Sequence, residues 1–121
     1  MSRACIVIAI LLLLSGCAHS DQWTRRDTVL QLAVNTVMLA DALSTARIRE
    51  TEYVSEVGPL AKQFLGAQPE TDKVVQYFVT VAIASYLISR ALPEKWRPYW
   101  QGWELAIHSY SVGRNCANGL C

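Results

Sequence analysis

The 121-residue sequence has no excess of charge of either sign, because 11 Lys and Arg residues stand against 10 Asp and Glu residues, for a net charge of +1. The charges are scattered, so there is no basic patch of the kind that binds nucleic acid. The sequence also has no Gly-x-Ser-x-Gly motif and no glycine-rich turn before a helix, which are signs of nucleophilic hydrolases and of phosphate loops. We therefore expect no nucleic-acid partner and neither of these two kinds of site.

Histidine is scarce, with His19 and His108 the two in the chain. Glu104 and His108 lie four residues apart on a predicted helix, and Asp41 and Glu56 could complete a site of three carboxylates and one imidazole. However, metal sites in helical bundles usually carry Glu-x-x-His on two helices, and this sequence has no such motif. We expect a polar pair within a helix interface, with no metal, no cofactor and no catalytic residue. A metal-dependent enzyme is the alternative.

The start of the chain is an apolar run over residues 6–14, preceded by Arg3 and followed by Ser15-Gly16-Cys17. This order is that of a secretory signal. Leu14-Ser15-Gly16-Cys17 resembles the cleavage and lipid-attachment site of bacterial lipoproteins. The resemblance implies lipidation of Cys17, with two or three acyl chains that suffice for stable anchoring. The alternative is an uncleaved helical anchor with an incidental cysteine, but the run is shorter than the ~20 residues of a membrane span.

Lipidation would divide the chain into a signal peptide (1–16), a polar tether (17–26), a helical domain (27–113) and a cysteine-containing tail (114–121). Removing 16 residues from 121 leaves 105, enough for one small domain with one core. By resemblance to enterobacterial sorting rules, Ala18 in place of Asp implies the outer membrane. The protein would lie on its periplasmic or surface face.

Of the four cysteines, Cys5 leaves with the signal and Cys17 takes the lipid. Cys116 and Cys121 remain, and an exported chain meets an oxidising compartment in which such thiols pair. Asn118-Gly119 between them readily forms a tight turn. We therefore expect a disulfide between Cys116 and Cys121, with two free thiols as the alternative.

Thr24-Arg25-Arg26-Asp27 has the form of a capping box, and apolar spacing without Gly or Pro predicts a helix from Asp27 to about Arg49. At 100° per residue its polar residues form one almost uncharged stripe, so we expect this stripe to lie in a helix interface. The stripe consists of Thr28, Gln31, Asn35, Asp41 and Thr45.

Residues 49–72 are predicted to form a structured connection with a single turn around 60–65, because glycines and prolines interrupt the periodicity. Thr71 is the predicted N-cap of the next helix. The stretch Val74–Leu92 is the most apolar part of the mature chain, with Arg90 its single charge. Its length just suffices for a membrane span, and it equally suits the core helix of a small bundle.

Pro93 is expected to stop that helix, and Pro98 to lie in the first turn of a last helix that ends at Val112 with Gly113 as its cap. Three of the four tryptophans fall within residues 96–103, beside two cations. They fit an aromatic belt at a membrane interface or, alternatively, aromatic packing at a bundle end. One broad face of the last helix carries Trp100, Gln101, Glu104, His108 and Ser111.

Asp41-Ala42-Leu43-Ser44-Thr45 and Glu56-Val57-Gly58-Pro59, followed by an apolar helix, resemble a group of small uncharacterised bacterial and phage helical membrane proteins. Their pattern is Asp-x-x-x-Thr and then Glu-x-Asn-Pro, and this sequence departs from it at Gly58. The resemblance implies no activity. It implies a polar cluster of Asp41, Thr45 and Glu56, and since buried carboxylates need partners, Arg90 or backbone N–H groups should supply them.

The sequence thus predicts an all-α protein of about three helices, anchored by lipid in the bacterial envelope. We expect a binding or structural role, with the membrane and another envelope protein as partners. A phage or prophage origin would fit exclusion of a second phage or the blocking of a receptor. The alternatives are a metal-dependent enzyme and an integral membrane component with a span at 74–92.

Overall fold

The computed structural model describes residues 21–121, so the predicted signal peptide, Cys17 and its lipid lie outside the described residues. Within this range the chain is all-α, as predicted, and contains no strand. The elements are α2 (Arg25–Ala46), the 3₁₀-helix η1 (Arg47–Glu50), α3 (Pro59–Leu65), α4 (Thr71–Ala91) and α5 (Arg97–Ala117). The three expected helices are the long ones, and α3 is a short addition.

The start of α2 has the predicted capping box. The Thr24 hydroxyl accepts a hydrogen bond from the backbone N–H of Asp27 at 3.2 Å, and the Asp27 carboxylate accepts one from the backbone N–H of Thr24 at 2.9 Å. These two bonds satisfy backbone donors that the first turn of a helix leaves free. With η1 the helical segment reaches Glu50, close to the predicted end at Arg49.

The connection after η1 is ordered by α3, which covers the predicted turn at 60–65. Pro59 occupies the first turn of α3, where its missing N–H is harmless. Gly66 ends α3 with φ of 78°, a conformation that favours glycine. The backbone N–H of Glu56 bonds to the carbonyl of Ala67 at 2.9 Å, so the two sides of α3 are joined.

The prediction of Thr71 as N-cap of α4 is wrong. Glu70 is the N-cap, and its carbonyl accepts the first helical hydrogen bond, from the backbone N–H of Val74 at 2.9 Å. Thr71 is already helical, and the side chain of Glu70 makes no capping bond. At the other end Leu92 is the C-cap and Pro93 follows it, as expected.

The predicted end of the last helix at Val112 is also wrong, because α5 continues through Gly113 to Ala117. The turn that stops it is built around Gly119, whose φ is 81°. There the backbone N–H of Leu120 returns to the carbonyl of Asn115 at 3.0 Å, and Leu120 is buried. A glycine with helical backbone geometry is no stop signal, whereas one with positive φ is.

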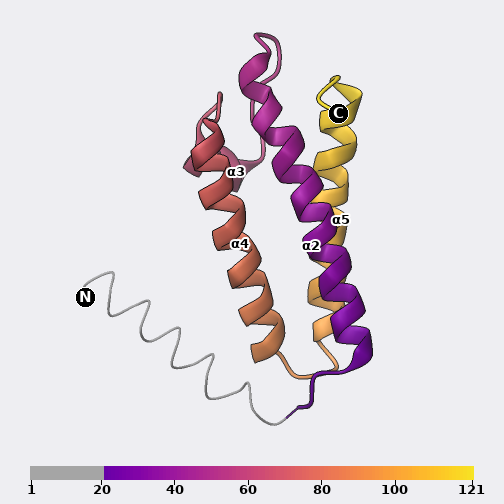
Figure 1. The fold of residues 1–121 in the computed structure, drawn as a ribbon. Coiled ribbons are helices and arrows are strands. Elements are labelled where there is room, and N and C mark those ends of the chain that lie inside the picture. Colours follow the sequence, from indigo (N-terminus) through magenta and orange to yellow (C-terminus); the bar gives the residue numbers. More distant parts are fainter. Residues whose placement is uncertain (1–20) are drawn as a thin grey trace, which may run out of the picture.

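The three long helices run up, down and up beside one another (Figure 1). α2 packs mainly against α5 and less against α4, while α4 and α5 contact each other least. One end holds the start of α2 and the link from α4 to α5, and is called the Asp27 end. The opposite end holds η1, α3 and the end of α5, and is called the α3 end.

The interior of the bundle is unusually polar. Within residues 21–121, twelve polar or charged residues are buried against eight hydrophobic ones. The apolar core is small and comprises Val34, Met38, Leu65, Val74 and Phe78. Large hydrophobic side chains instead lie on the outer faces of the long helices: Val29, Leu32, Leu39, Leu43, Val75, Val79, Ile83, Leu87, Trp103, Ile107 and Tyr110.

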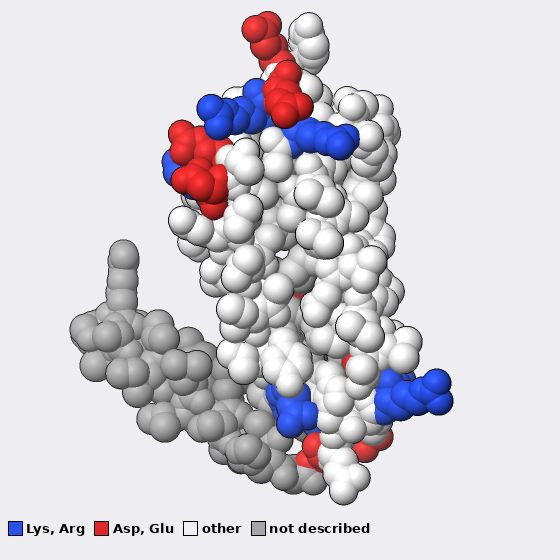
Figure 2. Space-filling view, in the orientation of Figure 1, with Lys and Arg blue, Asp and Glu red and all other residues white. Residues whose placement is uncertain are grey.

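Charged residues gather at the two ends of the molecule, and the middle of the face in Figure 2 is almost entirely uncharged. The sequence explains this distribution. Between Lys73 and Arg90, α4 carries no charge, and between Arg97 and Arg114, α5 carries Glu104 alone, which is buried. The outer surface therefore has an uncharged apolar band between two charged ends.

Two helical segments, Arg25–Glu50 and Thr71–Ala91, are long and apolar enough to cross a membrane by length and composition. The second covers most of the predicted span at 74–92. At most a third of either apolar window is buried inside the bundle, whereas the core helix of a soluble protein is mostly buried.

Candidate functional site

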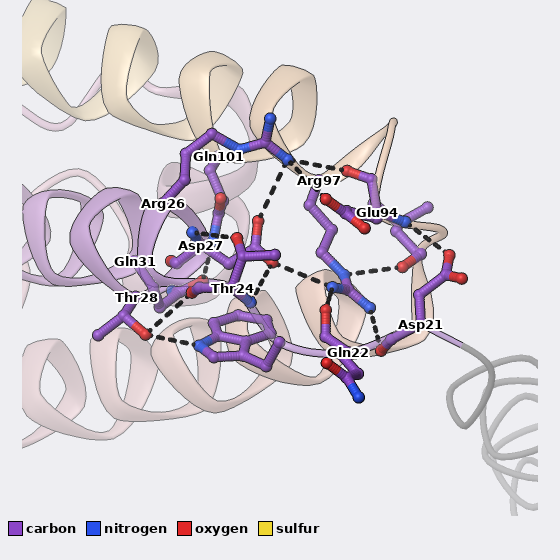
Figure 3. Close-up of polar contacts among 12 residues, drawn as sticks. Asp21, Gln22, Thr24, Arg26, Asp27, Thr28, Gln31, Glu94, Arg97 and Gln101 are labelled. Carbon is purple, nitrogen blue, oxygen red and sulfur yellow. Dashed lines mark hydrogen bonds and ion pairs between the residues drawn. The ribbon is translucent and has the colours of Figure 1, made fainter.

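A buried ion pair joins the first turns of α2 and α5 at the Asp27 end (Figure 3). Arg97 is 1% exposed and Asp27 is fully buried, and Arg97 Nη1 lies 3.0 Å from Asp27 Oδ2. The guanidinium also donates to three backbone carbonyls, of Gln22 at 2.8 Å and of Asp21 and Leu92 at 3.0 Å. These contacts spread its charge over several acceptors and fix the chain before α2 and after α4.

From this ion pair toward the middle of the bundle, further polar side chains are joined by hydrogen bonds. Gln101 Nε2 donates to the carbonyl of Asp27 at 3.1 Å and to Gln31 Oε1 at 3.2 Å. Gln31 Nε2 donates to the Ser85 hydroxyl at 3.2 Å, which donates to Glu104 Oε2 at 2.7 Å. α2, α4 and α5 are thus joined through polar side chains, as in helix packing with little apolar core.

A second group of bonds lies toward the α3 end. His108 Nδ1 is 2.7 Å from Asp41 Oδ2, which joins α5 to α2. Thr45 donates to the other oxygen of Asp41 at 3.3 Å, and Asn115 Nδ2 donates to the hydroxyl of Ser44 at 2.9 Å. Both groups together form what we call the polar seam: Asp27, Gln31, Asp41, Ser44, Thr45, Ser85, Arg97, Gln101, Glu104, His108 and Asn115.

The polar stripe predicted on the first helix is only partly internal. Gln31, Asp41 and Thr45 are buried, whereas Thr28 and Asn35 are exposed. The two exposed residues bond to side chains close in sequence instead. Thr28 accepts from the indole N–H of Trp23 at 2.9 Å, and Asn35 accepts from Gln31 at 3.2 Å.

Arg90 is not the partner of the buried carboxylates. Its guanidinium lies over the ring of Trp23, 5.1 Å from the centroid, at the Asp27 end. The alternative, a backbone N–H, is what Glu56 has: its Oε1 accepts from the backbone N–H of Gly58 at 2.7 Å. The carboxylate of Asp41, near the other end of α2, bonds to His108 instead.

Five predicted cluster residues line one pocket of about 530 Å³ at the α3 end: Asp41, Thr45, Glu56, Glu104 and His108. Its walls come from α2, α4, α5 and the segment 56–61, and Phe78, Val81 and Ile107 supply apolar surface. Glu104 and His108, expected to touch each other, instead bond to Ser85 and Asp41 on other helices. The predicted residues therefore line one pocket and do not form a single hydrogen-bonded cluster.

The structure places Cys116 and Cys121 in a disulfide, with Cα atoms 4.8 Å apart. The short loop follows the last turn of α5, and Arg47 Nη1 donates to the carbonyls of Leu120 at 3.2 Å and Cys121 at 2.8 Å. The loop is thereby held against the end of α2.

Within residues 21–121, no group of three or more His, Cys, Asp or Glu side chains could hold a metal ion. The four residues considered for a metal centre do line the same pocket. However, Asp41 and His108 bond to each other, and Glu104 bonds to a serine. The metal-dependent alternative therefore has no geometric support in the described part of the chain.

The sequence prediction missed the ion pair of Asp27 and Arg97, the pairing of Gln101 with Gln31, and the role of Asn115. The sequence predicts Asp27 as part of a capping box, and this prediction is correct. A signal was present, since Asp27 and Arg97 carry opposite charges in the first turns of two helices. However, the sequence does not predict that the first turns of these two helices lie side by side.

Comparisons of the chain with known protein families, with curated proteins and with solved structures give no match. The geometry of the bundle and its pocket is therefore the basis for assigning a function.

Proposed function

We propose that this protein is a small integral membrane protein of the bacterial envelope that acts by binding, with α2, α4 and α5 embedded across a lipid bilayer. The observation that supports this most is the reversed distribution of side chains: many large hydrophobic residues lie on the outer faces, and most of the buried residues are polar. In water such an exterior would expose large apolar patches, whereas in hydrocarbon it is the favourable arrangement.

The helix lengths fit this proposal. α2 has 22 residues and α4 and α5 have 21 each. At about 1.5 Å per residue they are roughly 32 Å long, close to the ~30 Å hydrocarbon thickness of a bilayer. In the face drawn in Figure 2, the uncharged band lies between the two charged ends.

Two threonine hydroxyls on the outer faces are satisfied within their own helices. The hydroxyl of Thr36 donates to the carbonyl of Leu32 at 2.8 Å, and that of Thr80 to the carbonyl of Gln76 at 2.7 Å. Such bonds to the preceding turn remove the need for water. They allow a threonine to face hydrocarbon.

Aromatic side chains and cations meet at the Asp27 end. Arg90 lies over Trp23, and Lys95 Nζ is 6.0 Å from the ring centroid of Trp96, which is 53% exposed. Tyr99 is also exposed and packs against Trp96. This supports the aromatic-belt interpretation of the tryptophan cluster, with these rings at the level of the lipid head groups.

A lipid at Cys17 remains part of the proposal. α2 begins eight residues after Cys17, so a lipidated sulfur would be close to the Asp27 end. The lipid anchor and the embedded helices would then each attach the protein to the membrane.

Alkaline carbonate extraction of membranes carrying the Cys17→Ala variant tests the proposal. We expect this variant to stay in the membrane pellet, because the embedded helices hold it without the lipid. The matched control is Cys5→Ala, which removes a thiol of the signal segment and leaves the lipid-attachment site intact. Release of Cys17→Ala into the supernatant, with Cys5→Ala retained, would contradict embedding.

Such a release would instead favour a second candidate, a lipoprotein held at the outer membrane by acyl chains alone. The sequence Leu14-Ser15-Gly16-Cys17 followed by Ala18 supports this candidate. Exclusion of a second phage or the blocking of a receptor would belong to it, and phage adsorption to cells with and without the protein would test that role.

A further inference from the structure

Two residues of opposite charge line the pocket at the α3 end, Glu56 and Arg114. Glu56 is 9% exposed, and one of its oxygens accepts the backbone N–H of Gly58, which leaves the other oxygen for a ligand. Neither Glu56 nor Arg114 forms an ion pair with any residue of the range 21–121. A buried carboxylate without a cation is unfavourable, so this pocket is suited to a charged group from outside the chain.

The other acidic residues of the pocket and its histidine already have partners. Asp41 and His108 bond to each other at 2.7 Å, and Glu104 accepts from Ser85 at 2.7 Å. Glu56 and Arg114 are thus the charges left to meet a ligand. Since the two do not form an ion pair with each other, they match a ligand that carries a cation and an anion on separate groups.

The pocket walls are apolar and reach the outer surface. Phe78 and Val81 of α4 and Trp103 and Ile107 of α5 line it, and its volume of about 530 Å³ is that of a small-molecule pocket. Trp103 and Ile107 are 62% and 41% exposed, so the pocket opens on the outer face of α5. In an embedded bundle that face contacts lipid.

We infer that this pocket binds one phospholipid with a zwitterionic, amine-bearing head group. Its ammonium would donate to Glu56, its phosphate would bind Arg114, and an acyl chain would lie against the walls of α4 and α5. Both charged residues belong to the α3 end, where lipid head groups would lie. The inference rests on the proposed embedding. A helix of a second copy on this face would leave both charges without a partner.

The test uses the purified full-length protein in detergent micelles, with three phospholipids that share the same acyl chains. Phosphatidylethanolamine has N–H donors, phosphatidylcholine has a cation without N–H, and phosphatidylglycerol has no amine. Native mass spectrometry counts bound lipid, and thermal unfolding measures the stabilisation that a ligand of the folded state confers. We expect one phosphatidylethanolamine per chain, with about tenfold weaker binding of the other two, since each lacks a charge-assisted hydrogen bond to Glu56.

Substitutions at the two charges locate the head group. Glu56→Gln and Arg114→Gln should each weaken phosphatidylethanolamine binding about tenfold, and Glu56→Asp should restore part of it. The matched controls are Glu70→Gln and Arg49→Gln, exposed residues of the α3 end that do not line the pocket. Thermal unfolding without lipid shows whether each variant is folded.

Equal binding of the three lipids by the wild-type protein would overturn the inference, as would unchanged selectivity in a folded Glu56→Gln variant. A dimer without bound lipid would overturn it too. Because carbonate extraction tests embedding independently, a protein that stays in the pellet but shows no lipid selectivity contradicts the lipid site alone.

Discussion

At the residue scale, the Asp27 end depends on Arg97. Its guanidinium meets the Asp27 carboxylate and three backbone carbonyls while 1% exposed. Removing one partner of a buried pair leaves the other charge uncompensated, which is more damaging than the pair itself is stabilising. The pair therefore makes the first turns of α2 and α5 sensitive to the loss of either partner.

We predict that Arg97→Met lowers the free energy of unfolding by about 3–5 kcal/mol. The buried Asp27 carboxylate then loses its hydrogen-bonded cation and keeps only the half-exposed Arg26, whose Nη2 lies 3.8 Å from Asp27 Oδ1. Adding Asp27→Asn should recover part of the loss, since it removes that charge. Arg26→Met is the matched control. Arg26 is 52% exposed and 3.8 Å from both Glu94 and Asp27, without a hydrogen bond to Asp27, so its loss should be below about 1 kcal/mol. Thermal unfolding in detergent micelles measures all three, and an effect of Arg97→Met no larger than that of Arg26→Met would contradict the prediction.

At the scale of the element, α5 and the turn after it contain two glycines in different backbone conformations. Gly113 lies inside the helix, and no atom lies within 4 Å of the position a β-carbon would take. Gly119 has a φ of 81° in the turn that closes the disulfide loop. The same substitution should therefore have opposite effects at the two positions.

We predict that Gly113→Ala raises stability by about 0.5–1 kcal/mol, because alanine is the better helix former and meets open space. Gly119→Ala should lower stability by about 1–2 kcal/mol, because a side chain disfavours positive φ. Circular dichroism during thermal unfolding follows both variants. A destabilising Gly113→Ala would instead indicate that α5 ends at Val112, as the sequence had suggested.

At the scale of the whole molecule, three crossings would put the Asp27 end and the α3 end on opposite sides of a membrane. A lipid on Cys17 would place the Asp27 end outside the cytoplasm. The disulfide at the α3 end would by itself favour an oxidising compartment there. The two features thus favour opposite orientations, and an accessibility measurement decides between them.

We predict that single cysteines at the two ends react from opposite sides of the membrane. Tyr53→Cys reports the α3 end, where Tyr53 is 94% exposed, and Glu94→Cys reports the Asp27 end. Both are made in a background with Cys5→Ser, Cys116→Ser and Cys121→Ser, and labelled in intact cells with a membrane-impermeant maleimide. The background without an added cysteine shows whether Cys17 itself reacts. Labelling of one site in intact cells, and of the other only after lysis, fits three crossings. Labelling of both in intact cells would rule them out.

Several parts of this structure could be predicted from local sequence. The capping box at Thr24, the stop at Pro93 and the tight turn at Asn118-Gly119 depend on residues close in the chain, and all three are present. The predicted N-cap of α4 and the predicted end of α5 were wrong. In each case the sequence offers two nearby residues that could mark the helix end, and only the backbone conformation shows which one does. Glu70 rather than Thr71 begins α4, and α5 passes through Gly113.

The sequence alone determined that the chain is helical, because apolar periodicity and helix caps act over a few turns. It also identified Asp41, Glu56, Glu104 and His108 as polar residues of the interior. Only the tertiary structure decided their partners. His108 meets Asp41 across 67 positions and Arg97 meets Asp27 across 70, and such pairings depend on how three helices pack side by side. Packing also left Glu56 and Arg114 lining one pocket without an ion-pair partner within the described chain.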